Sequence, residues 1–211
     1  DNEQPKFAHL SLLLKPDGKG KLSKRDGDRL GFPVFPLEWT NSEGEKSRGY
    51  REDGYFPDAF VNLLALLGWN PGTEQEIFSL EELAESFSLD RVIKSGARFN
   101  PDKARWFNQE YLRMRSPEEL AEVFSAQLSE KGITKNIEYI TSVVSLLKER
   151  AVFIKEFWDL GDYFFVRPHE YDQNVKTKFW KEETPGILNE ISVMLNSLED
   201  FNKENIEHTL P

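Results

Sequence analysis

The apolar residues from position 57 onward recur with the 3.6-residue period of α-helices, and this pattern constrains the fold more than any other feature. The first set lies between Pro57 and Gly68 and occupies positions i, i+3, i+4 and i+7: Phe60, Leu63, Leu64 and Leu67. Proline favours the first turn of a helix, and glycine favours the residue after its end. The segment therefore predicts one helix with a single buried face. Because further segments of this kind follow, we predict a mainly α-helical fold.

Capping sequences mark where the next helices begin. Two stretches, residues 79–82 and 116–119, have the Ser-x-x-Glu pattern of a capping box. The residues expected on the apolar faces behind them are Leu80, Leu83, Ala84 and Phe87 for the first helix, and Leu120, Val123, Phe124 and Leu128 for the second. Asn100 is expected to cap a third helix, which starts at Pro101. The inward-facing residues of that helix are predicted to be Ala104, Phe107, Tyr111 and Leu112.

The pattern stays helical to the end of the chain. Residues 136–158 carry one continuous apolar period, which Gly161 ends. A helix around residues 174–182 is predicted next, and then another that starts at Thr184. The residues that we expect this last helix to bury are Ile187, Leu188, Ile191, Leu195 and Leu198. Asn202 is suited to cap a further helix.

The N-terminal part has a different character. Residues 7–14 predict a short buried strand that has no partner strand nearby in the sequence. The loop that follows, residues 15–27, contains four lysines, one arginine and three glycines. Glycines let a backbone bend and approach a ligand closely, and lysines supply mobile charges that match phosphate oxygens. The loop therefore suits a polyphosphate, with a solvated hairpin as the alternative; it is not a Walker A loop.

Composition sets limits on the class of protein. With 211 residues, 38% of them hydrophobic and 13% aromatic, the chain can build a core. It has no apolar run of membrane-spanning length, and its first residues do not resemble a signal peptide. The absence of cysteine excludes disulfides and thiolate metal sites and fits a reducing cytoplasm. The three histidines, His9, His169 and His208, lack the spacing of metal ligands, so we expect no protein metal site.

Net charge argues against a nucleic-acid partner unless the basic residues gather on one surface. The formal charge is -10, whereas phosphate binding usually leaves a basic footprint. Residues 15–29 are such a gathering of basic residues.

Several segments in register resemble one family. Residues 21–25, Lys-Leu-Ser-Lys-Arg, resemble the KMSKS-type signature of class I aminoacyl-tRNA synthetases. The segments that resemble successive parts of bacterial glutamyl-tRNA synthetases are 7–14, 50–59, 62–69, 77–83 and 99–112. We therefore identify the chain as similar to that family, and as a C-terminal fragment that begins just before the KMSKS-type loop, because nothing like the family's HIGH motif occurs in it.

The resemblance implies three regions. Residues 1–27 would be a strand and loop remnant of the Rossmann-like catalytic domain. Residues 28–115 would be a stem-contact domain, with an insertion at about 28–49. Within this insertion we expect Phe32, Phe35 and Trp39 to cover the adjacent core, and residues 43–48 to form a mobile tip. Residues 116–211 would be a truncated, helical anticodon-binding region.

The resemblance also implies a reaction. The full-length enzyme would activate glutamate with ATP, accompanied by Mg²⁺, and transfer it to tRNA(Glu). Lys21 and Lys24 would be catalytic, with Lys24 neutralising charge that develops on the α-phosphate. Lys21, Ser23, Lys24 and Arg25 would bind ATP, and Ser23 would hold the turn or donate a hydrogen bond. Asp26 either turns the chain together with Gly27 or pairs with one of the neighbouring arginines, Arg25 or Arg29.

For tRNA, the resemblance offers five candidate phosphate contacts: Arg98, Lys103, Arg105, Arg113 and Arg115. Trp106 and Tyr111 are expected to be core residues rather than platforms for bases. We expect a cytoplasmic monomer without membrane contact, and a fragment that is inactive alone. The alternative function is a non-catalytic helical scaffold that binds a protein partner.

Overall fold

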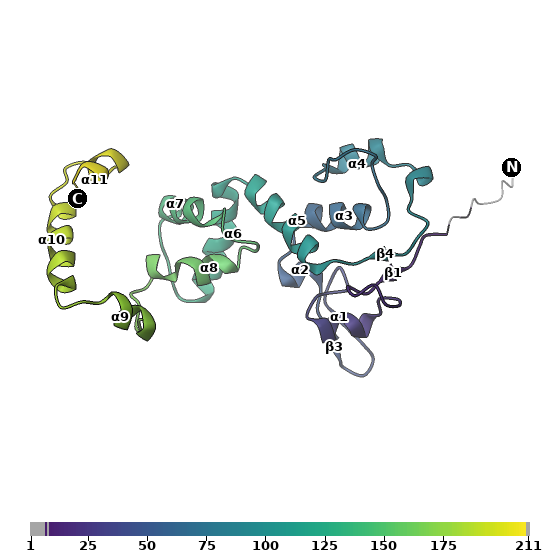
Figure 1. Ribbon diagram of the computed structural model, residues 1–211, viewed down its shortest axis with the longest axis horizontal. Coiled ribbons are helices and arrows are strands. Elements are labelled where there is room, and N and C mark those ends of the chain that lie inside the picture. The colour runs from purple at the N-terminus through teal and green to yellow at the C-terminus, as the bar shows by residue number, and fades with distance from the viewer. Residues whose placement is uncertain (1–6, 8, 210–211) are drawn as a thin grey trace. The chain divides into compact units, whose positions relative to one another are not determined.

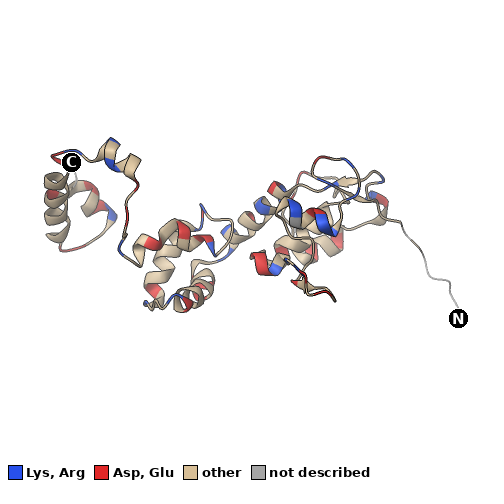
Figure 2. Cartoon of the chain, turned by 90° about the horizontal axis from the view of Figure 1, so that it is seen from below, with Lys and Arg blue, Asp and Glu red and all other residues tan. Residues whose placement is uncertain are grey.

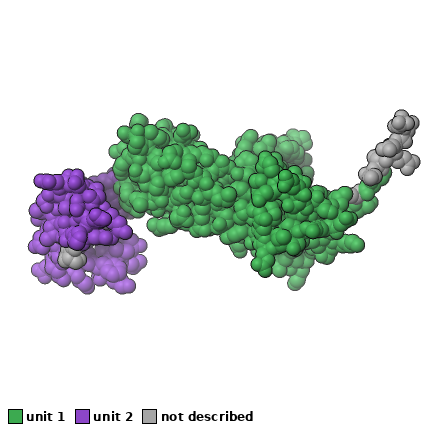
Figure 3. Space-filling view, turned by 90° about the horizontal axis from the view of Figure 1, so that it is seen from above, with its two compact units in different colours: residues 1–165 green, residues 166–211 purple. Residues whose placement is uncertain are grey.

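The computed structural model describes residue 7 and residues 9–209, which form two compact units, residues 1–165 and 166–211 (Figures 1 and 3). Helices dominate both, as the sequence predicts. Among the described residues, none of the helices combines the length and apolar composition that crossing a bilayer requires.

The first unit begins with a strand whose partner lies far along the chain. Strand β1 (Leu13–Leu14) pairs in parallel with β4 (Ala97–Arg98), so that Leu13 lies opposite Ala97. The prediction of a buried strand over residues 7–14 is wrong, because only Leu13 and Leu14 enter a ladder among the described residues of this stretch, and Leu10 and Leu12 are exposed. Phe7 is 86% exposed. Residue 8 lies outside the described residues.

A helix and a hairpin follow the basic loop. Helix α1 (Lys24–Leu30) starts inside the stretch predicted as a loop. Strands β2 (Trp39–Thr40) and β3 (Lys46–Ser47) then form an antiparallel hairpin, which leads into α2 (Tyr50–Asp53). The predicted mobile tip at 43–48 includes β3 and also Arg48, whose guanidinium forms three hydrogen bonds of 2.7, 2.8 and 2.9 Å to the Asp53 carboxylate.

Three helices and a 3₁₀ turn complete this part: α3 (Pro57–Leu66), α4 (Leu80–Ser86), η1 (Leu89–Arg91) and α5 (Pro101–Met114). Helix α3 packs against both α4 and α5. The predicted capping box at Ser79 and the Asn100 cap are confirmed. The buried residues of the main cluster here are Phe32, Tyr50, Leu63, Phe99, Ala104 and Phe107. A smaller cluster holds Trp69, Phe78 and Leu83.

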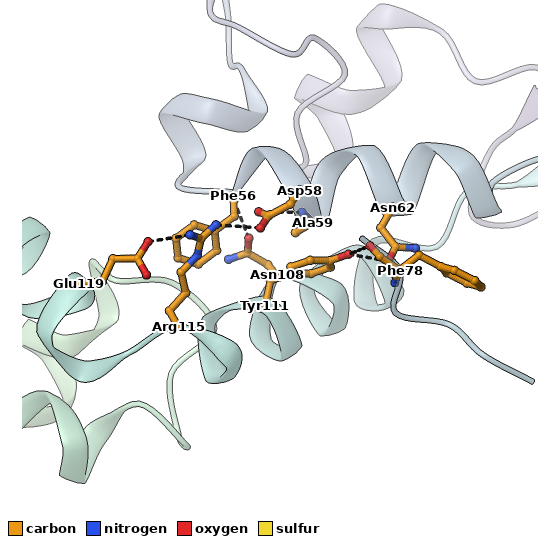
Figure 4. A network of polar contacts seen from close by, with 9 residues as sticks. All are labelled: Phe56, Asp58, Ala59, Asn62, Phe78, Asn108, Tyr111, Arg115 and Glu119. Atoms are coloured by element: carbon orange, nitrogen blue, oxygen red, sulfur yellow. Dashed lines mark hydrogen bonds and ion pairs between the residues drawn. The ribbon is translucent and has the colours of Figure 1, made fainter. Parts of the chain in front are cut away.

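Some predicted core residues lie at the surface instead. Leu64, Leu80, Phe87 and Val123 are each about half exposed or more. On α3 the buried side chains are Ala59, Asn62 and Leu63, so its inner face is rotated toward the polar Asn62. The physical reason is that Asn62 finds hydrogen-bond partners inside, which Figure 4 shows.

A second bundle follows in the same unit. Its elements are α6 (Pro117–Glu130), α7 (Ile137–Leu147), α8 (Glu156–Gly161) and the 3₁₀ turn η2 (Asp162–Phe164). The buried residues that these share with the end of α5 are Leu112, Leu120, Ala121, Phe124, Leu128, Ile140, Val143, Val144, Leu147, Ala151 and Phe157. The predicted single helix 136–158 is wrong. The chain turns after Leu147, where the N–H of Arg150 donates to the Leu147 carbonyl at 2.9 Å. A new helix then starts at Glu156, whose carboxylate accepts the backbone N–H of Val152 at 2.7 Å.

The second unit consists of α9 (Gln173–Phe179), α10 (Thr184–Asn196) and α11 (Lys203–Thr209). The predicted cap is confirmed, since Asn202 accepts the N–H of Asn205 at 2.9 Å. The predicted burial along α10 is wrong: none of its residues is buried, and Ile187 and Leu188 are about half exposed. The reason is that α10 packs against α11, a helix of 7 residues, which is too short to cover its apolar face.

Candidate nucleotide-binding loop and basic surface

Glycines close the basic loop into a tight turn. Gly18 and Gly20 have φ angles of 75° and 84°, in the left-handed region that favours glycine. The N–H of Gly18 donates to the Lys15 carbonyl at 2.8 Å, and the N–H of Lys15 donates to that of Gly20 at 3.1 Å. Leu22 then returns to β1, donating its N–H to Leu13 at 2.7 Å. The turn therefore has a defined shape and ends beside the strand.

Asp26 ties the two ends of this loop together. Its carboxylate accepts the Ser23 hydroxyl at 2.5 Å and the Ser23 N–H at 3.0 Å. It also forms ion pairs with Arg29 at 2.9 Å and Lys15 at 3.4 Å. The Ser23 hydroxyl, the Ser23 N–H and Lys15 together lower the pKa of Asp26 from 3.8 to about 2. Asp26 thus does more than turn the chain with Gly27: of the two arginines that the sequence offered, it pairs with Arg29.

Lys21, Lys24 and Arg25 all lie exposed at the surface. Lys21 forms an isolated bridge to Leu14, and Lys24 and Arg25 form the start of α1. The Lys24 ammonium lies 5.1 Å from the centroid of the Phe35 ring and 5.6 Å from that of Trp39.

This contact between Lys24 and the two rings was not predicted from the sequence. Trp39 is 47% exposed, so the expectation that it covers the core is wrong, whereas Phe32 is buried as expected. The two aromatic residues lie four positions apart, but this spacing alone does not predict a contact with Lys24.

The five candidate tRNA contacts lie on or next to α5 and β4, and each already has a partner. Lys103 pairs with Glu76 at 2.7 Å, Arg105 with Glu156 at 3.3 Å, Arg113 with Glu110 at 2.9 Å, and Arg115 with Asp58 at 2.8 Å and Glu119 at 2.6 Å. Arg98 donates to the carbonyl oxygen of Pro16, which closes the basic loop onto β4. Figure 2 shows positions of basic and acidic residues interspersed along the helices.

Tyr111 is a core residue, as predicted. Its hydroxyl lies 2.6 Å from the carbonyl oxygen of Phe78 and 2.7 Å from Oδ1 of Asn62 (Figure 4), and burial raises its pKa. Trp106 is half-buried, with the Lys103 ammonium 3.6 Å from its ring centroid. The Tyr111 ring is therefore buried in the core, whereas the Trp106 ring is only partly covered.

A resident metal site is not evident in the described part of the chain. No group of three or more His, Asp or Glu side chains there is placed to hold an ion.

Two family models match the sequence. Residues 1–106 match the catalytic domain of the class I tRNA synthetases (E and Q), and residues 114–211 match an anticodon binding domain. The chain belongs to the class I tRNA synthetases of this E and Q family.

The curated relatives carry one name. The chain is 57% identical over 205 residues to the glutamate–tRNA ligase of Flavobacterium psychrophilum, covering 97% of this chain and 40% of the relative. It is 49% identical over 211 residues to that of Porphyromonas gingivalis, covering 100% of this chain and 42% of the relative. It thus spans about 40% of the length of these relatives.

A solved structure shares the fold. The glutamate tRNA ligase of Elizabethkingia meningosepticum, in complex with its amino acid, superimposes with a TM-score of 0.92 at 46% identity. That match covers 98% of this chain and 41% of the other. The resemblance seen in the sequence, and the mainly helical fold that it implied, are confirmed.

Proposed function

We propose that this chain is the part of an ATP-dependent glutamate–tRNA ligase that holds the phosphates of ATP and binds tRNA(Glu). The observation that carries the proposal is that the stretch matched by the catalytic-domain model exposes Lys21 at the end of the shaped loop and Lys24 at the first residue of α1. The names of the relatives support the same activity.

In the first step of this reaction, the glutamate carboxylate attacks the α-phosphate of ATP and pyrophosphate leaves. Negative charge grows on the phosphate oxygens, so a nearby ammonium stabilises the transition state more than the ground state. Lys24 is assigned this role, with Lys21 in support. Arg25 adds a third charge for the phosphates, and Ser23 acts by holding the turn through Asp26.

The rest of the chain is assigned to tRNA. Residues 28–115 would contact the stem and residues 116–211 the anticodon region, beyond the catalytic remnant of 1–27. Five basic residues are assigned to the phosphates of the RNA: Arg98, Lys103, Arg105, Arg113 and Arg115. The last four pair with carboxylates and would exchange these partners for phosphates when RNA binds. Because the relatives are longer than this chain, we propose that the chain alone does not aminoacylate tRNA. We also propose that the whole ligase is a cytoplasmic monomer.

Binding of transcribed tRNA(Glu) to this chain tests the proposal. We expect binding that weakens linearly in a plot of log K against log salt, since each phosphate contact releases counterions. A tRNA for another amino acid is the control for selectivity. Absence of binding at low salt would contradict the proposal and favour a helical scaffold that recognises protein.

A further inference from the structure

Phe35 and Trp39 form an aromatic surface beside Lys24. The two rings stack with centroids 5.5 Å apart and an angle of 27° between their planes. The Lys24 ammonium lies within reach of both ring faces, at 5.1 and 5.6 Å. Such distances give a cation–π attraction, because the face of an aromatic ring carries negative charge. We call this pair the aromatic seat.

The hairpin that carries the seat is fixed at its base. The backbone of Tyr50 donates to the Phe35 carbonyl at 2.9 Å, and that of Arg51 donates to Pro36 at 3.1 Å. The N–H of Glu38 donates to the Glu52 carboxylate at 2.6 Å. Both rings therefore stand on a backbone that is held to α2.

The helix that carries Lys24 is fixed as well. Asp26 holds the Ser23 N–H and hydroxyl, and Arg29, one turn along, pairs with the same carboxylate. Behind α1, Phe32 is buried against Phe99, with ring centroids 4.7 Å apart. The backbone of Lys24 and the backbone that carries the two rings are thus both held in place. Only the flexible side chain of Lys24 can adjust the distance between its ammonium and the rings.

The contact with the rings leaves the charge of Lys24 in place, because an aromatic ring carries no net charge. Two nearby lysines have acidic partners: Lys15 pairs with Asp26 at 3.4 Å, and Lys46 pairs with Glu38 at 3.0 Å. The seat holds the ammonium without cancelling its charge, and its exposed side stays open to an anion.

We propose that Phe35 and Trp39 are positioning residues for Lys24, which limit the conformations of its side chain before a phosphate arrives. This inference rests on the proposed function of Lys24. A free lysine stem loses rotamer freedom when it is ordered, and a lysine already held by the rings loses less. A phosphate then competes successfully, because a charge-assisted hydrogen bond is stronger than an exposed cation–π contact.

The contact itself is tested by NMR on this chain, with lysines carrying ¹³C-dimethyl labels and Lys24→Arg identifying the signal. Ring currents should shift the Lys24 methyl signal away from those of other exposed lysines. We expect Trp39→Leu to remove most of this shift, Trp39→Phe to keep it, and an unchanged unfolding midpoint to show that the fold persists.

Lys178 gives a matched control, because its ammonium lies 5.0 Å from the Phe179 centroid in the other unit. Phe179→Leu should move the Lys178 signal and leave that of Lys24 in place. If the Lys24 signal stays unchanged when Phe35 and Trp39 are both leucine, the seat does not exist.

The positioning role is tested by ATP–pyrophosphate exchange in a ligase of the relatives' full length that contains this chain. We expect Trp39→Leu to lower kcat about two- to fivefold, the size of an exposed cation–π contact, with KM for glutamate unchanged and Trp39→Phe restoring the rate. In a Lys24→Met background, Trp39→Leu should cause no further loss.

The outcomes separate the two proposals. If the losses from Trp39→Leu and Lys24→Met multiply, the seat does not act through Lys24. If Lys24→Met leaves exchange unchanged, the proposed role of Lys24 fails, and the positioning role fails with it, even where NMR shows the contact.

Discussion

The side-chain carbonyl of Asn108 accepts the backbone N–H of Phe56 at 2.8 Å, deep in the first unit (Figure 4). The same amide donates from Nδ2 to the carbonyl oxygen of Val152 at 2.6 Å, and the residue is fully buried. Asn108 lies between the stretches matched by the two family models, and its partners belong to one stretch each. One amide group thus fastens the two regions together.

Replacing Asn108 by leucine should lower the free energy of unfolding by about 3 kcal/mol. The change leaves an N–H and a carbonyl without partners in a largely buried place, at about 1–3 kcal/mol for each. Urea titration measures the loss. Asn174→Leu, at an exposed position on α9, is the control and should change stability by no more than about 0.5 kcal/mol. Equal stability of the two variants would show that the Asn108 amide does not fasten the regions.

Asp26→Asn should destabilise the protein at neutral pH, and the effect should fade in acid. Because folding lowers the pKa of Asp26 from 3.8 to about 2, its carboxylate stabilises the fold above pH 3.8. That contribution is lost as the pH falls toward 2. Thermal midpoints of the wild type and the variant, measured from pH 7 downward, should converge between these values. A difference that stays constant to pH 2 would rule out this carboxylate as the source.

Gly49→Ala should destabilise the protein, by about 1–3 kcal/mol as for other overpacked sites. A Cβ at this position would collide with the backbone of Leu37 and Glu38, which cannot move aside as a side chain tip could. Gly68→Ala is the matched control, since no atom lies within 4 Å of its added Cβ. Chemical denaturation measures the free energy of unfolding of both variants. Equal values for the two would show that the base of the hairpin has room for a Cβ at residue 49.

Lys24→Ala, in a ligase of the relatives' full length that contains this chain, should raise the activation free energy of glutamate activation by about 3 kcal/mol, roughly a hundredfold in rate. The reason is the loss of one preorganised charge at the α-phosphate. Pyrophosphate exchange measures this step without requiring tRNA. An unchanged exchange rate would show that Lys24 has no role in glutamate activation.

Arg105→Gln should reduce the slope of log K against log salt for tRNA(Glu) binding by about 1, as expected for one phosphate contact. Arg51→Gln is the control, because Arg51 is also an exposed arginine paired with a carboxylate, at 2.8 Å from Glu52, but is not assigned to RNA. Equal slopes for Arg105→Gln and the wild type would mean that Arg105 serves only its pair with Glu156.

The sequence predicted best those elements whose signals are local. The caps at Ser79 and Asn100 and the inward residues of α5 follow from spacing alone. The break between α7 and α8 could not be seen, because Ala151 and Phe157 enter the same core as α7 and so continue its apolar period. The pairing of β1 with β4 was also hidden, since strands of two residues carry no alternation.

The candidate site also contains residues that the sequence predicts and contacts that it does not. Lys21 and Lys24 were identified by a short contiguous motif, which the sequence displays directly. The partners of Lys24 could not be predicted, because Phe35 and Trp39 reach it only through the fold of the hairpin. The Asp26 pair with Arg29 was one of several options, and only the start of α1 at Lys24 places these side chains one turn apart.

The attachment of the hairpin at its base has a consequence for how this segment can change in length. Asn41 organises the bend by accepting the N–H groups of Glu43 and Glu45. These contacts do not involve α2, which holds the base of the hairpin. Extra residues inserted at this bend would project into solvent and leave the surroundings of Lys24 as they are. Length variation among related proteins should therefore be tolerated between Asn41 and Glu45, while a deletion between Phe35 and Glu38 would shift the rings relative to the lysine.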